Sequence, residues 1–164
     1  MINKKIESAI NGQIQAELYS SYLYLAMSAY CQSLNFKGFA HWLKMQAEEE
    51  VEHALKFYNF LLDRGGTVEL LAIQKPPVSF VTPAKAFSQA YGHEQKVTGL
   101  INKLYELARQ EKDYAFEQLL HWFIDEQVEE EAQTQEISEI LAKLGGKGNG
   151  IWMLDHRLGK RKGE

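Results

Sequence analysis

The chain has 164 residues but only three prolines, and all of them lie between Pro76 and Pro83. Proline is the strongest breaker of a helix interior, because it lacks the N–H that the helix needs and its ring clashes with the preceding turn. The rest of the chain can therefore form long helices. We expect them over residues 3–32, from 35 to Gly65–Gly66, over 82–110 and from 113 to Gly145–Gly146, with a short one over 151–158 and with Asn35, Thr82 and Asp113 as N-terminal caps.

The stretch between the second and third helices decides the topology. The connections near Asn35 and Lys112 are short, so each joins two antiparallel helices. The stretch from Gly65 to Thr82 could span roughly 50 to 60 Å, whereas a helix of about 28 residues is roughly 42 Å long. It can therefore run the length of the bundle. We predict an all-α single domain over residues 1–164, with a four-helix bundle over about 3–144, one long crossover, and a short fifth C-terminal helix over about 150–160.

Composition excludes several other classes of protein. Apolar residues make up 45% and charged residues 24% of the chain, which is typical of a globular domain with a sizeable core. The net charge of −4 disfavours nucleic-acid binding, and the single cysteine, Cys31, excludes disulfide frameworks and paired-cysteine metal sites. The first residues lack the apolar run of a signal peptide. We therefore expect a cytoplasmic protein with no nucleic-acid partner and no membrane contact.

A carboxylate stands at the centre of the apolar stripe of each long helix. At about 100° per residue, the stripes are centred on Glu17, on Glu50, on Glu94 and on Glu130 with Gln127. These positions lie near the helix midpoints, so the deduced topology brings them together in the core. The stripes themselves consist, in chain order, of Ile6, Ile10, Ile14, Ser21, Tyr24 and Ser28; Phe39, Leu43, Ala47, Ala54, Phe57 and Leu61; Phe87, Ala90, Tyr91, Thr98, Ile101 and Tyr105; and Phe116, Leu119, Phe123, Ile137 and Leu141.

Four buried carboxylates need a positive partner. Burial costs each on the order of several kcal/mol and the four repel one another, yet no lysine or arginine shares these stripe positions. A bound cation solves both problems, and His53, one turn after Glu50, adds an imidazole on the same face. Oxygen ligands with one imidazole and no thiolate suit iron, manganese or zinc. If Glu50 bridged two Fe(II) ions, both could give electrons to one dioxygen molecule.

Four segments carry a resemblance to a known family: residues 16–22 (AELYSSY), 49–53 (EEVEH), 93–95 (HEQ) and 125–131 (DEQVEEE). In combination and spacing they resemble bacterial-type non-haem ferritins, members of the ferritin-like class that exemplifies carboxylate metal sites in bundles. The resemblance implies a ferritin-like fold and iron storage with ferroxidase activity. Such a protein oxidises Fe(II) with O2 or H2O2 and keeps Fe(III) as a hydrous oxide mineral inside a hollow homo-oligomeric shell of 24 subunits.

The resemblance also implies which residues bind iron. It assigns two iron ions to each ferroxidase centre and a third to a neighbouring site. The first iron would be held by Glu17, Glu50 and His53, the second by Glu50, Glu94 and Glu130 with Gln127 close by, and the third by Glu49, Glu126 and Glu129 with Glu130 shared. No haem is implied, because the fourth helix has Gln127-x-x-Glu130 where haem-containing relatives have a second Glu-x-x-His.

Two alternatives stay open. The buried acids could hold a structural divalent ion in a non-catalytic bundle, although a structural site should be coordinatively closed, whereas the second half of this site has no imidazole. Tyr24, on the face of Glu17, could hydrogen-bond a ligand or supply an electron as part of the catalytic centre. It could equally be an ordinary core tyrosine.

The expected outward surface of the first helix suggests association between subunits, and two further expectations concern the C-terminal segment. No charge appears from Leu18 to Phe36, and the outward side of this helix stays apolar, which favours a subunit interface. Tyr22→Glu or Ala26→Glu should then release smaller species in light scattering, and an unchanged size would contradict this. The short fifth helix could line a pore with Ile151, Leu154 and Leu158, and we expect the basic tail, residues 160–162, to be solvated.

Overall fold

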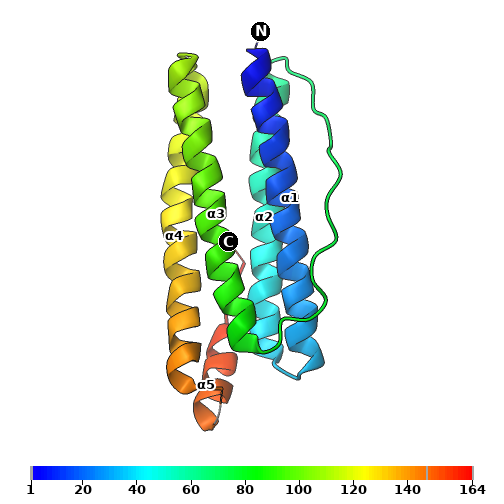
Figure 1. Cartoon of the computed structure of the whole chain (residues 1–164), viewed down its shortest axis with the longest axis vertical. Helices are drawn as coiled ribbons and strands as arrows, with labels where there is room; N and C mark the ends of the chain where they lie inside the picture. Colours follow the sequence, from blue (N-terminus) through cyan, green and yellow to red (C-terminus); the bar gives the residue numbers. More distant parts are fainter. Residues whose placement is uncertain (1, 147, 164) are drawn as a thin grey trace.

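The computed structural model describes residues 2–146 and 148–163, so the expected domain limits at 1 and 164 lie outside the described residues. It contains two antiparallel helix pairs that stand side by side, with a short helix at one end (Figure 1). The helices are α1 (Lys4–Ser33), α2 (Lys37–Asp63), α3 (Pro83–Gln110), α4 (Tyr114–Leu144) and α5 (Asn149–Leu158). The prediction of an all-α four-helix bundle with a short fifth helix is confirmed.

The capping residues follow the prediction with one exception. Thr82 and Asp113 cap α3 and α4, because their side chains accept hydrogen bonds from backbone N–H groups of the first turn. Asn35 does not cap α2. It adopts a left-handed conformation with φ 64° and ends α1, where the N–H of Phe36 donates to the carbonyl of Cys31. Asparagine is suited to both helix ends, since it caps through its side chain and tolerates the left-handed conformation.

The crossover makes α2 and α3 parallel, as predicted. It leaves α2 at one end of the bundle, follows α1, and enters α3 at the other end (Figure 1). Side chains of α1 hold its backbone in place. Asn11 donates to the carbonyl of Thr67 at 3.0 Å and accepts from the N–H of Glu69 at 2.9 Å, and Gln15 donates to the carbonyl of Ala72. The crossover thus satisfies backbone groups without regular secondary structure of its own.

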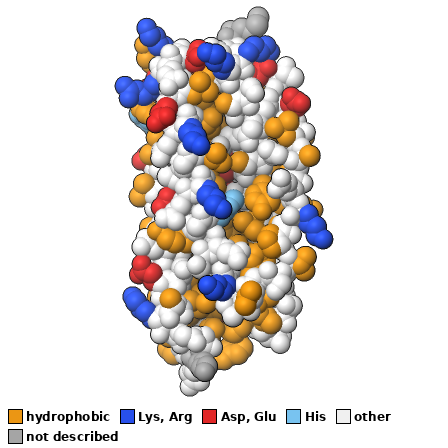
Figure 2. Space-filling view, viewed as in Figure 1, with side chains coloured by type: hydrophobic (Ala, Val, Ile, Leu, Met, Phe, Trp, Pro, Cys, Tyr) orange, Lys and Arg blue, Asp and Glu red, His pale blue; other side chains and the backbone are white. Residues whose placement is uncertain are grey.

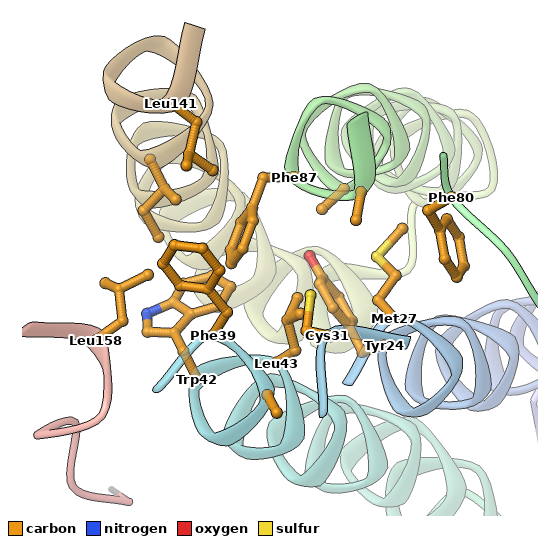
Figure 3. Close-up of a cluster of buried hydrophobic side chains, with 14 of the residues drawn as sticks. Tyr24, Met27, Cys31, Phe39, Trp42, Leu43, Phe80, Phe87, Leu141 and Leu158 are labelled. Carbon is orange, nitrogen blue, oxygen red and sulfur yellow. The ribbon is translucent and has the colours of Figure 1, made fainter. Parts of the chain in front are cut away.

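The hydrophobic core consists of two clusters, one toward each end of the bundle. The cluster near α5 contains Tyr24, Met27, Phe39 and Phe87, and Figure 3 shows these side chains converging from α1, α2 and α3. The other cluster packs the first half of α1 against the second halves of α2 and α3 and the start of α4. In α4 the stripe runs through Leu120, which is fully buried, whereas the expected Leu119 is only partly buried. The gap between the clusters falls at the middle of all four helices.

α5 packs across the N-terminal end of α2. Phe36, the residue before α2, offers no side-chain acceptor, and Asp155 of α5 instead accepts from the N–H of Phe39 at 2.8 Å. This approach needs Gly38, because a Cβ there would lie 1.7 Å from the carbonyl oxygen of Asp155. The side chains expected to line a pore are buried in the core of the same subunit, so that expectation is wrong for Ile151, Leu154 and Leu158. The opposite side of α5 carries the exposed Trp152 and Met153.

The outward face of α1 is partly covered by the chain itself. Leu23 is buried in the core, and the ring of Tyr30 packs edge-on against Phe80 of the crossover at 5.6 Å, whereas Tyr22 and Leu25 are exposed. Figure 2 shows apolar side chains gathered between α3 and α1, where the surface is hollowed by a groove of about 620 Å³.

Among the described residues, no helix is both long and apolar enough to span a bilayer.

Candidate metal centre

The carboxylates singled out in the sequence form one buried layer between the two hydrophobic clusters. Glu17, Glu50, Glu94 and Glu130 come from α1, α2, α3 and α4, and their exposed fractions are 1%, 1%, 0% and 3%. The sequence places each between apolar residues of both clusters, so the packing that builds the core also removes these four side chains from water. Such burial is rare for glutamate unless it has a partner.

The first half of the layer consists of Glu17, Glu50 and His53, which together offer three ligand atoms within 4.8 Å of one another. His53 Nδ1 lies 3.4 Å from Glu50 Oε2. Gln13 donates to Glu17 Oε1 at 2.8 Å. Within the described residues, however, the other oxygen of Glu17 and Glu50 Oε2 are buried with no hydrogen-bond donor. Two buried acceptor atoms without donors are costly, and either a carboxyl proton shared by Glu17 and Glu50 or a cation placed between them would remove this cost.

The second half consists of Glu94, Gln127 and Glu130, and three of its carboxylate oxygens have protein donors. The Tyr24 hydroxyl donates to Glu94, and Gln127 Nε2 lies 3.3 Å from the other carboxylate oxygen of Glu94. Gln46 of α2 donates to Glu130. The hydroxyl of Tyr24 therefore touches a candidate ligand directly, which favours the hydrogen-bonding role that the sequence left open.

Burial dominates the electrostatics of the layer. It raises the pKa of Glu17 and that of Glu94 to about 7, with hydrogen bonds from Gln13 and Tyr24 opposing the rise. The pKa values of Glu50 and Glu130 are raised well above the usual range by burial and then by neighbouring carboxylates. Near neutral pH, the metal-free centre therefore holds protons that a metal ion would have to displace.

His53 is held in the form that binds metals. Burial and, to a smaller extent, nearby Lys56 lower its pKa to about 4, so its ring is neutral across the physiological range. Trp122 stands edge-on to this ring at 5.5 Å and Phe123 at 6.0 Å. These contacts fix the orientation of the imidazole.

The residues implied for a third iron are less closely grouped. Glu126 joins His53 and Glu130 in a second set of three ligand atoms within 4.8 Å. Glu129 is exposed and accepts from Gln133 at 2.7 Å. Glu49 is half-buried and forms an ion pair with Arg161 of the tail. The expectation that the tail is solvated is therefore wrong for Arg161. The tail folds back because the guanidinium of Arg161 forms an ion pair with Glu49 on α2.

Sequence reasoning missed three polar side chains of this region. Gln13 and Gln46 each precede a stripe-centre glutamate by four residues, which places them on the same helix face, so the helical period could have revealed them. Arg161 carries no such signal, since it lies beyond the last helix and meets Glu49 only in the folded chain.

The donor set limits the chemistry. Carboxylate and amide oxygens with one neutral imidazole suit Fe, Mn or Zn. The carboxylates of Glu17, Glu94 and Glu130 all lie close enough to repel that of Glu50, so two ions could sit side by side with Glu50 between them. The fold and this donor set together define a four-helix bundle with a carboxylate-rich metal centre.

Comparisons with known proteins agree with this class. Residues 7–144 match the family model described as a ferritin-like domain. The bacterial non-heme ferritin of Bacteroides fragilis is 41% identical over 161 residues, covering 98% of this chain and 100% of the relative. That of Staphylococcus aureus is 38% identical, covering 98% and 97%. The chain belongs to the ferritin family, in its bacterial non-haem branch.

Solved structures of archaeal ferritins have the same fold. A closed form engineered from the Archaeoglobus fulgidus ferritin superposes with a TM-score of 0.98 at 43% identity and covers 100% of both chains. The open-pore ferritin of the same organism gives 0.97 at 43% identity, covering 99% of this chain and 100% of the other. The similarity includes the crossover and α5, which lie outside the core four helices.

Proposed function

We propose that this protein is an iron-storage ferritin with ferroxidase activity, in which Glu17, Glu50, His53, Glu94, Gln127 and Glu130 form the catalytic centre. The observation that carries the proposal is the pair of donor-free oxygens on Glu17 and Glu50, buried beside the neutral imidazole of His53. A cation would supply what these atoms lack. The family membership selects Fe(II) as that cation and as the substrate.

The reaction requires two Fe(II) ions at one centre. Each gives one electron, so the pair reduces O2 with two protons to H2O2, or reduces H2O2 with two protons to two water molecules, leaving two Fe(III) ions. The first ion binds to Glu17, Glu50 and His53, and the second to Glu94 and Glu130 with Glu50 shared. Displacement of the carboxyl protons by Fe(II) supplies protons at the site where reduced oxygen needs them.

Storage follows from transfer out of the centre. Glu126 lies 3.9 Å from His53 Nε2 and belongs to the neighbouring group with Glu130, so it can take an ion from the centre. We assign Glu49, Glu126 and Glu129, with Glu130, to a third iron site on this route. The second half of the centre has no imidazole, which favours loose binding and onward transfer of Fe(III).

Assembly completes the proposal. We propose a cytoplasmic homo-oligomeric shell of 24 subunits without haem, with the mineral inside. Exposed Tyr22 and Leu25 on α1 and Trp152 and Met153 on α5 are apolar surface available for subunit contacts.

The decisive experiment adds a large molar excess of Fe(II) to the metal-free protein in air, follows the absorbance, and then applies size exclusion. Rapid colour with soluble iron eluting at shell size is the expected result. Oxidation limited to about two irons per chain, with the excess precipitating, would contradict storage. Binding of a divalent ion without any accelerated oxidation would instead support the structural-ion alternative.

A further inference from the structure

Arg161, in the tail that follows α5, is held against α2 by several contacts. Its Nη2 lies 2.7 Å from Glu49 Oε1 and 2.5 Å from Glu49 Oε2, and its Nη1 donates to Gln46 Oε1 at 2.7 Å. The guanidinium also lies over the ring of Trp42 at 4.7 Å. The imidazole of His41 hydrogen-bonds the carbonyl oxygen of Arg161 at 2.7 Å. Only 16% of the Arg161 side chain is exposed.

These contacts reach the metal centre in one further step. Gln46, which accepts from Arg161 through its Oε1, donates through its Nε2 to Glu130. Arg161 therefore fixes which way the Gln46 amide points, and so which group faces Glu130. Its positive charge also acts on Glu130 through space, where it opposes the rise in pKa caused by burial.

The same contacts occupy both carboxylate oxygens of Glu49. A metal ion and a guanidinium need the same lone pairs of a carboxylate, and both are cations, so they compete for it. An ion that binds Glu49 must therefore displace Arg161, and the tail then loses its one charged partner among these contacts with α2.

We propose that Arg161 is a positioning residue and a tethered counter-cation: it holds Glu49 and Gln46 while the neighbouring iron site is empty, and an ion entering that site displaces it and releases the tail. The inference rests on the proposed function, since it concerns the site next to the ferroxidase centre. Arg161 keeps the acidic group compact in the metal-free protein and raises the concentration of iron needed to fill the third site. Iron thus fills the ferroxidase centre before it fills the site beyond.

Calorimetric titration of the assembled, metal-free protein with Zn(II) tests the competition. In Arg161→Gln, ions beyond the first two per chain should bind about tenfold more tightly, as expected when a charged hydrogen-bonding competitor is removed. The first ion, held by Glu17, Glu50 and His53, should bind as in the unaltered protein. Arg157→Gln is the matched control, because it removes the same charge from α5, where Arg157 pairs with the exposed Glu136 at 3.1 Å.

A spin label on the tail tests the displacement. Gly163→Cys can carry a nitroxide, because the one native cysteine, Cys31, is fully buried and burial raises its pKa to about 12. Zn(II) beyond two ions per chain should sharpen the spectrum as the tail becomes mobile. In Glu49→Gln, the spectrum should already be sharp without zinc and should not change on its addition.

The outcomes separate this inference from the proposed function. Equal Zn(II) affinity in Arg161→Gln and the unaltered protein, or a label that stays immobile when the later ions bind, overturns the role of Arg161 alone. Failure of even the first two ions to bind overturns the metal centre itself. Tighter binding in Arg161→Gln together with a released label supports the inference.

Discussion

The two halves of the metal centre differ in how the protein treats their oxygens. In the half formed by Glu17, Glu50 and His53, two buried carboxylate oxygens have no donor among the described residues. In the half formed by Glu94 and Glu130, Tyr24, Gln127 and Gln46 supply donors. The oxygens of the first half thus have only a shared carboxyl proton or a cation to satisfy them, whereas protein donors reach three carboxylate oxygens of the second half. The comparison teaches that a symmetric-looking pair of sites can bind its ions in a fixed order.

Removal of Glu50 and His53 together should have the largest effect on the metal centre. Loss of outer partners of a metal site costs about 10–100-fold in affinity or activity, so loss of two direct ligands should slow fast Fe(II) oxidation by more than about 100-fold. Stopped-flow absorbance measures the rate, and size exclusion checks assembly. Glu48→Ala with Glu52→Ala is the control, since both residues are exposed on the same helix. Oxidation at the unaltered rate would show that the site is assigned wrongly.

Single replacements should distinguish the halves. Glu17→Ala should weaken the first Zn(II) ion by about 10–100-fold, because it removes a ligand from the half that has the donor-free oxygens. Glu94→Ala should leave the first ion nearly unchanged and weaken the second. Calorimetry of the metal-free protein measures both steps. If the two variants lose the same step, the binding order inferred from the hydrogen bonds is wrong.

Tyr24→Phe should have a smaller effect, confined to the second half. It removes the hydroxyl that donates to Glu94, a hydrogen bond to a charged acceptor worth about 1.5–3 kcal/mol. The second Zn(II) ion should change its affinity by about tenfold, while the first stays constant. Tyr30→Phe is a matched control at a tyrosine outside the centre. A slower oxidation rate with both affinities unchanged would point instead to electron donation by Tyr24.

The smallest expected effect is on the stability of the metal-free protein as a function of pH. The pKa values of Glu17 and Glu94 rise from 4.5 to about 7 on folding. As pH rises from 4.5 to 7, these groups lose protons in the unfolded chain first, so the unfolding free energy falls and stays lower above pH 7. Thermal unfolding midpoints should drop by several degrees across this window. Glu17→Gln and Glu94→Gln should each flatten the dependence, and a midpoint that rises with pH would contradict the raised pKa values.

The sequence predicted the residues of the site but not the long-range contacts made by the C-terminal segment. Helical periodicity located Glu17, Glu50, Glu94 and Glu130, because burial along a straight helix follows directly from residue spacing. The sparse prolines and the length of the crossover predicted the topology, because both can be read directly from the order of residues along the chain. Asn35 was misassigned, since one residue type suits both helix ends and only the backbone geometry decides between them.

Contacts between distant segments were beyond such reasoning. Arg161 meets Glu49 across 112 residues and Asp155 meets Phe39 across 116, and neither pair shares a repeat or a helix face. Both depend on how α5 docks, and this in turn depends on the absence of a side chain at Gly38. Packing of this kind follows from the assembled surface rather than from a periodic pattern.

The hydrogen bond that Asp155 accepts at the start of α2 has a consequence for how the subunit folds during translation. The ribosome needs on the order of ten seconds to add the 116 residues between Phe39 and Asp155. During that time α1 and the rest of α2 can already pair, while the first turn of α2 still lacks this acceptor. The end of the bundle that is synthesised early is thus completed last, and only a chain translated as far as α5 can close it.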